Sequence, residues 1–103
     1  LKIREKNPDL PVIMATKTDI PRSPAAEKSN AAHRAVVYET YENAVKRGDR
    51  NVIFIDGATV FSKALTLSAP ADSCTVDGCH PNDLGFACMA KVFGDAIEKM
   101  FGL

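Results

Sequence analysis

The sequence has no net charge and no long apolar run, and each of these two absences excludes a class of protein. Its 103 residues contain 13 Lys and Arg against 13 Asp and Glu, so no basic field exists to attract nucleic acid or an anionic membrane. The apolar runs are short, whereas a membrane-spanning helix needs roughly 20 apolar residues. The sequence therefore predicts no nucleic-acid partner and no membrane span.

Only three cysteines are present, Cys74, Cys79 and Cys88, and this odd number excludes a fully paired disulfide scaffold. Their spacings match no zinc finger or ribbon. Asp77 and His80 offer two metal ligands, but no third ligand lies at a useful spacing, so we predict no metal site. The sequence favours three reduced, partly packed thiols over a Cys74–Cys79 disulfide, which would need an oxidising compartment.

Two apolar runs without polar alternation, residues 11–15 and 51–55, predict buried parallel strands. Helical spacing predicts a short helix within 1–7, a long helix from about 29 to 46 and a final helix over 83–101. Strands that alternate with helices are typical of parallel βαβ units. Because two strands alone do not make a stable parallel sheet, the whole chain is expected to be the C-terminal part of a three-layer α/β/α domain.

Details of the two long helices are also predicted. Residues 20–28 are expected to form a loop, since Ser29 or Asn30 can cap the next helix as well as Ser23 can. In the final helix, Gly94 costs stability relative to Ala, which indicates close packing there. Apolar residues at intervals of three and four are expected to face the core: Phe86, Met89, Phe93, Ile97 and Met100.

The segment that follows residue 76 carries the strongest chemical signal. Asp77 and His80 are three residues apart, Gly78 lets the backbone turn between them, and Pro81 disfavours helical dihedrals at His80. A carboxylate bonded to the Nδ1–H of a histidine fixes its tautomer and leaves Nε2 as a general base. The spacing predicts such a pair, and a salt bridge that caps a helix is the alternative interpretation.

Polar residues also follow both predicted strands, where open α/β sheets place their ligand crevice. Lys17, Asp19 and Asp56 are candidates for the rim of a site, together with Thr16. Ordinary strand-end polar groups and caps are the alternative for each of them. His33, near the start of the long helix, is expected to be a surface residue.

The block from Asp77 to Asn82, DGCHPN, resembles the last sequence block of the SGNH (GDSL) hydrolases. These are serine esterases and lipases with a flavodoxin-like α/β/α sandwich. The continuation over 83–86 and the preceding run over 52–57 are similar to a bacterial GDSL-like branch. The resemblance implies that His80 is the general base and Asp77 its orienting carboxylate. It also implies a small ester substrate, such as an acetylated carbohydrate, and no cofactor.

Other parts of that family's machinery are not in the sequence. It contains no Gly-Asp-Ser block and no oxyanion-hole Gly and Asn blocks. The nucleophile is therefore expected from an upstream part of the same domain or from a second chain, and the 103 residues alone are expected to be inactive. The alternative is a non-catalytic flavodoxin-like ligand-binding module. Five serines lie in no matching context: Ser23, Ser29, Ser62, Ser68 and Ser73.

Overall fold

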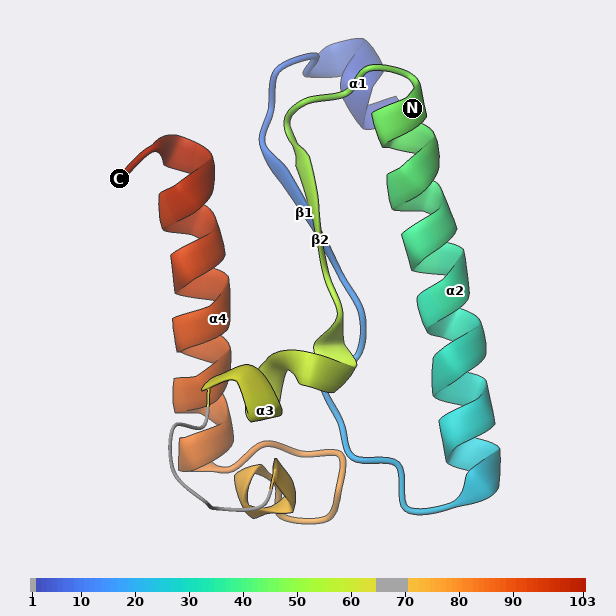
Figure 1. Ribbon diagram of the computed structural model, residues 1–103, viewed down its shortest axis with the longest axis vertical. Coiled ribbons are helices and arrows are strands. Elements are labelled where there is room, and N and C mark those ends of the chain that lie inside the picture. Colours follow the sequence, from blue (N-terminus) through green and yellow to red (C-terminus); the bar gives the residue numbers. More distant parts are fainter. Residues whose placement is uncertain (1, 65–70) are drawn as a thin grey trace.

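The computed structural model describes residues 2–64 and 71–103, and it is built around two parallel strands (Figure 1). β1 (Val12–Ala15) pairs with β2 (Val52–Ile55), with Val12 opposite Val52 and Ala15 opposite Ile55. Both strands consist largely of β-branched and apolar residues, which favour extended backbone and burial. The predicted parallel pairing of the two apolar runs is confirmed.

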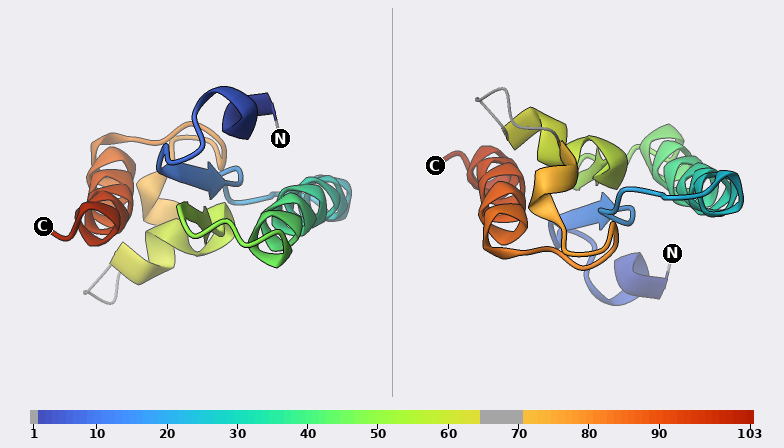
Figure 2. Two further views of the ribbon diagram at one scale, coloured as in Figure 1. Left: turned by 90° about the horizontal axis from the view of Figure 1, so that it is seen from above. Right: turned by 90° about the horizontal axis from the view of Figure 1, so that it is seen from below.

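Two long helices, α2 (Pro24–Lys46) and α4 (Asp83–Phe101), lie on opposite sides of the strand pair (Figures 1 and 2). α2 connects the strands, as expected for a βαβ unit. Within the described residues, no helix is both long enough and apolar enough to cross a bilayer. The remaining elements are short: α1 (Lys2–Lys6), η1 (Gly57–Thr59), α3 (Val60–Ala64) and η2 (Ala71–Cys74).

α2 begins earlier than the sequence pattern indicated. Ser23 is its N-cap, and the Ser23 hydroxyl accepts a hydrogen bond from the main-chain N–H of Ala26 at 3.1 Å. Pro24 occupies the first turn, where a residue without an N–H is tolerated best. The expected loop over 20–28 is therefore wrong for its second half, and so is the start near residue 29. Proline at the first position selects Ser23 among the competing caps.

α4 begins where it was predicted, but it turns a different face to the core. Phe86 is 57% exposed and Ile97 is 44% exposed, so their assignment to the core is wrong. The close packing expected at Gly94 is also absent, since a Cβ there would meet nothing within 4 Å. Gly85 of α4 is buried, and the apolar side chains of the helix that are buried or pack against the core are those of Cys88, Met89, Val92, Phe93 and Ala96.

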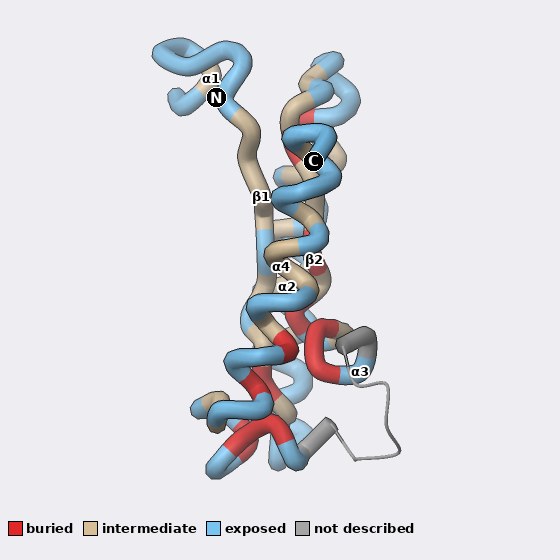
Figure 3. Tube along the Cα trace, turned by 90° about the vertical axis from the view of Figure 1, so that its left-hand side faces the viewer, coloured by how far each residue is buried: buried red, intermediate tan, exposed pale blue. Residues whose placement is uncertain are grey.

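The core lies at the carboxyl end of the two strands, next to α3, η2 and the first turns of α4 (Figure 3). Gly85 lets α4 approach η2 closely, because a Cβ at this position would overlap the carbonyl of Cys74. The start of α4 is thereby fixed beside the strand ends. The buried cluster consists of Ile55, Val60, Phe61, Cys74 and Cys88.

The loops that leave the two strands meet through their main chains. The N–H of Gly57 donates to the Thr16 hydroxyl at 2.8 Å. A Cβ at Gly57 would overlap the carbonyls of Thr16 and Lys17, so only glycine permits this approach. The contact holds both loops together at the edge where the candidate site lies.

Candidate active site

The segment from Thr75 to Pro81 forms a tight turn directly before α4. Thr75 and Pro81 make an isolated antiparallel bridge, and the N–H of Val76 donates to the His80 carbonyl at 2.9 Å. Gly78 reverses the chain with a φ of 90°, a value that residues with a side chain rarely adopt. The turn therefore holds Asp77 and His80 on the two limbs of one short loop.

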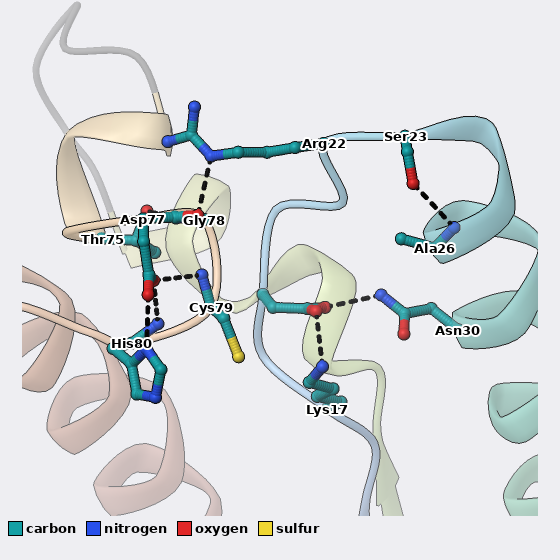
Figure 4. A network of polar contacts seen from close by, with 11 residues as sticks. Lys17, Arg22, Ser23, Ala26, Asn30, Thr75, Asp77, Gly78, Cys79 and His80 are labelled. Atoms are coloured by element: carbon teal, nitrogen blue, oxygen red, sulfur yellow. Dashed lines mark hydrogen bonds and ion pairs between the residues drawn. The ribbon is translucent and has the colours of Figure 1, made fainter.

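The carboxylate of Asp77 organises this turn (Figure 4). Its Oδ1 accepts hydrogen bonds from the main-chain N–H groups of Cys79 at 2.9 Å and His80 at 2.8 Å. Its Oδ2 lies 2.6 Å from Nδ1 of His80. These contacts hold the pKa of Asp77 well below its usual range, with the main-chain N–H of His80 as the largest cause and the imidazole next. Asp77 is therefore an anion wherever the protein is folded near neutral pH.

The imidazole of His80 presents its second nitrogen to solvent. An ionised carboxylate only accepts hydrogen bonds, so the Nδ1 that faces Asp77 carries the proton and Nε2 is left as an acceptor. The side chain is 76% exposed, and no described residue hydrogen-bonds to Nε2. The predicted contact between Asp77 and His80 is thus present, and it leaves Nε2 as the nitrogen that can accept a proton.

Lys17 and Asp19, predicted for the rim, lie close to this turn. The Asp19 carboxylate is buried, and it accepts from the Asn30 amide at 2.8 Å and pairs with the Lys17 ammonium at 2.9 Å. The hydrogen bond and charge of Asp19 raise the pKa of Lys17, and the side chain of Cys79 adds to the effect. Lys17 therefore stands between the buried Asp19 and the residue that precedes His80.

Thr16 and Asp56 hold main chain in place instead. The Thr16 hydroxyl is taken up by Gly57, as described above. Asp56 caps η1, where its carboxylate accepts from the N–H of Ala58 at 3.0 Å, and it pairs with Arg34 at 3.3 Å. Both residues fit the strand-end alternative considered for them.

A cavity of about 460 Å³ opens between the loop after β1 and α2. Lys17 and Asp19 line it, and so does His33, whereas Asp77 and His80 are not among its lining residues. The predicted surface histidine therefore sits beside the rim residues, although it makes no contact with Asp77 or His80 among the hydrogen bonds of the described residues.

The three cysteines are free thiols. Cys74 and Cys88 are buried with their sulfur atoms 3.8 Å apart, and Cys79 is exposed. The alternative Cys74–Cys79 disulfide is therefore not formed. Burial raises the pKa of Cys74 to about 11, with a further contribution from Cys88. A thiol of this kind is unreactive at neutral pH.

No hydrogen bond joins His80 to a serine among the described residues. Ser23 caps α2, and the Ser62 hydroxyl donates to the Thr59 carbonyl at 3.0 Å. Ser68 lies outside the described residues. The described side chains of His, Cys, Asp and Glu nowhere form a group of three that could hold a metal ion.

Sequence reasoning missed the residues that hold the turn from outside. Arg22 donates from Nε to the Asp77 carbonyl at 2.8 Å, and Ile20 donates its N–H to the Gly78 carbonyl at 2.6 Å. Both contacts end on main-chain atoms more than 50 positions away, so no motif marks them. The one available signal was indirect: the loop follows a predicted strand, and the turn was expected near the same end of the sheet.

A sequence model of the GDSL-like lipase/acylhydrolase family matches residues 1–98. The chain belongs to this family. A GDSL-like lipase from Bacteroides ovatus ATCC 8483, known from a crystal structure, is similar to it with a TM-score of 0.77 and 29% sequence identity. That alignment covers 97% of the chain and 28% of the Bacteroides protein. A comparison with curated proteins found no match.

Membership in the GDSL-like lipase/acylhydrolase family bears on the turn described above. It supports a hydrolase interpretation of the chain, and it agrees with the family resemblance of the DGCHPN block. The chain spans little more than a quarter of the length of this structural relative.

Proposed function

We propose that this chain supplies the Asp77–His80 half of a Ser-His-Asp triad in a GDSL-like serine ester hydrolase. The observation that carries the proposal is the 2.6 Å contact between Asp77 and Nδ1 of His80, with Nε2 open to solvent. A carboxylate bonded in this way keeps the imidazole in the tautomer that accepts a proton at Nε2. Family membership adds the reaction class.

In the proposed reaction, Nε2 of His80 takes the proton of a serine hydroxyl as its oxygen attacks the ester carbonyl. The same proton then passes to the leaving alcohol, and an acyl-enzyme remains. His80 next takes a proton from water, whose oxygen attacks the acyl carbonyl, and the proton returns to the serine as the acid leaves. Asp77 stabilises the imidazolium in both halves of the reaction. No step uses a cofactor.

The serine nucleophile and the oxyanion-hole donors belong, in this proposal, to a part of the protein outside these 103 residues. An upstream part of the same domain, or a second chain, would add strands beside β1 and β2 and complete a flavodoxin-like three-layer sandwich. The exposed edges of the two-stranded sheet provide the main-chain groups for such pairing. The proposed substrate is a small ester, with an acetylated carbohydrate as the first one to test.

Labelling with a fluorophosphonate, which reacts with activated serines, tests the proposal in the full-length protein. We expect one labelled serine, located by mass spectrometry outside residues 1–103, and we expect His80→Ala to abolish the labelling. His33→Ala is the matched control and should label normally. Labelling that persists in His80→Ala would refute the triad, and no labelling in any variant would favour a ligand-binding module.

The 103 residues alone provide a second test. They contain a base but no activated nucleophile and no oxyanion hole, so they should hydrolyse p-nitrophenyl acetate no faster than free imidazole does. Turnover well above that rate, insensitive to His80→Ala, would place the chemistry elsewhere in the chain.

A further inference from the structure

We propose that Arg22 is a positioning residue for the Asp77–His80 pair, and that the loop over 16–22 holds the turn in its working geometry. The inference rests on the function proposed above. It assigns a role to a segment that carries none of the reacting groups.

The turn satisfies the N–H groups of Gly78, Cys79 and His80 internally, but the carbonyls of Asp77 and Gly78 find their donors outside it. The N–H of Gly78 donates to the Thr75 hydroxyl at 2.9 Å, and those of Cys79 and His80 donate to the Asp77 carboxylate. The carbonyls of Asp77 and Gly78 point the other way, toward the loop after β1 (Figure 4). Hydrogen bonds from within the turn therefore fix one side of it, and the other side depends on the neighbouring loop.

That loop supplies two donors to two consecutive carbonyls. Arg22 Nε donates to the Asp77 carbonyl at 2.8 Å, and the Ile20 N–H donates to the Gly78 carbonyl at 2.6 Å. The contact is close, because a Cβ at Gly78 would overlap both the Arg22 side chain and the Ile20 carbonyl. The Arg22 bond restrains the peptide group between Asp77 and Gly78 against rotation, and the Ile20 bond restrains the next one, between Gly78 and Cys79.

The loop is itself anchored to α2. Buried Asp19 lies in its middle and accepts a hydrogen bond from Asn30 of α2 at 2.8 Å, while Lys17 pairs with the same carboxylate. Polar contacts thus tie the loop to α2 at Asp19 and to the turn at Ile20 and Arg22, and a short stretch of main chain connects the two anchor points. A loop with a buried, fully bonded carboxylate at its centre can serve as a rigid support.

Arg22 acts on Asp77 through the main chain and not on the carboxylate directly. Its guanidinium bonds the Asp77 carbonyl, whereas His80 and Cys79 account for the contacts of the carboxylate. Loss of the Arg22 bond would let the 77–78 peptide rotate and would change the direction of the Asp77 side chain. Displacement of a catalytic group by about 1 Å costs on the order of 10²-fold in rate.

The test compares Arg22→Met, Arg22→Lys and the control Arg34→Met in the full-length protein. Arg34 pairs with Asp56 near the same edge but does not touch the turn. Turnover of p-nitrophenyl acetate is measured per active site, with the sites counted by fluorophosphonate titration so that unfolded molecules do not contribute. We expect Arg22→Met to lower kcat by about 10- to 100-fold with little change in KM.

Arg22→Lys should restore most of the lost kcat, because an ammonium can donate to the same carbonyl, and Arg34→Met should keep the wild-type kcat. Equal losses in Arg22→Met and Arg34→Met would overturn the positioning role, as would a wild-type kcat in Arg22→Met. If Arg22→Met does not fold, a kcat in Arg22→Lys as low as that of Asp77→Asn overturns it. Full activity of His80→Ala would instead refute the proposed function, and this role with it.

Discussion

Each end of the two-stranded sheet carries a carboxylate 2.6 Å from a basic side chain. At the amino end Asp49 Oδ2 meets Arg4 Nε, and at the carboxyl end Asp77 Oδ2 meets His80 Nδ1. Both carboxylates also accept main-chain N–H groups, from Asn51 in one case and from the turn in the other. The two pairs differ in the basic partner and in burial.

The Arg4 guanidinium donates hydrogen bonds to several neighbouring groups. Besides Asp49, it donates to the carbonyl of Leu10 at 2.6 Å and to that of Asn51 at 3.2 Å, and both side chains of the pair are mostly buried. A guanidinium has no acceptor and does not give up its proton in proteins. His80 keeps an open nitrogen that can accept a proton. The comparison teaches that a short contact to a carboxylate can serve chemistry only where the basic partner keeps a nitrogen that can accept a proton. Where the partner has no such nitrogen, the contact is structural.

The largest expected effect is a loss of activity on substitution of His80, with no such loss on substitution of Arg4. His80→Ala in the full-length protein should lower kcat/KM for p-nitrophenyl acetate by about 10⁴- to 10⁶-fold, because the serine loses its base. The melting temperature should stay at the wild-type value, since the side chain is largely exposed. Arg4→Met, at the other end, should leave kcat/KM unchanged. A variant of Arg4 that loses as much activity would erase the distinction.

Asp77→Asn should produce the next largest effect. The amide oxygen of Asn can still accept the N–H groups of Cys79 and His80, so the turn persists while the charge that orients the imidazole is lost. We expect kcat/KM to fall by about 10²- to 10⁴-fold, less than in His80→Ala. A loss as large as that of His80→Ala would mean that the carboxylate does more than orient the ring.

Arg4→Met should instead lower the thermal stability of the protein. It leaves Asp49 without its cation and the Leu10 carbonyl without a donor, so the melting temperature should fall by about 5 °C. Lys91→Met is the matched control, because it breaks an exposed pair with Asp95 that contributes little. A melting temperature in Arg4→Met as high as in the control would show that the amino end is not a structural clamp.

Acid should weaken the Asp49–Arg4 and Asp77–His80 pairs, and the resulting loss of stability should be the smallest of these four predicted effects. The pKa of Asp49 is lowered, mainly by the Arg4 hydrogen bond, and that of Asp77 is lowered by its turn. A carboxyl whose folded pKa lies below its unfolded value stabilises the fold above about pH 4, and loses this contribution as the pH falls through the folded pKa. The urea concentration at the unfolding midpoint should therefore decrease when the pH is lowered from 6 to 3, and it should decrease less in Asp49→Asn than in the wild type. An equal decrease in the wild type and in Asp49→Asn would contradict a stabilising role for the Asp49 carboxylate.

Local signals in the sequence predicted much of this arrangement. Unalternated apolar runs mark the two strands, and the Asp-x-x-His-Pro spacing gives the Asp77–His80 contact, because both depend on neighbouring residues. Periodicity marks α4 as amphipathic but not which side its neighbours cover, and Phe86 was assigned to the core for that reason. The start of α2 was missed because several polar residues can cap a helix.

The support of the turn could not be predicted, because it depends on tertiary structure. Arg22 reaches a main-chain carbonyl, and any residue provides such a carbonyl, so the pair leaves no trace in residue types. The same holds for Asp19, whose burial follows from the position of α2 and not from its neighbours in sequence. The catalytic role of His80 stays a prediction that the experiments above decide.

The main-chain contact at Gly57 has a consequence for how the strands align. If β2 slipped by one residue against β1, Asp56 or Ala58 would come to lie under the carbonyls of Thr16 and Lys17. Either residue carries a Cβ, and the two loops would be forced apart. A single glycine thus rejects misaligned pairings that apolar runs on both strands would otherwise tolerate. The loop that touches Gly57 continues to Arg22, which bonds the turn that carries His80. The alignment of the strands therefore also affects the position of His80.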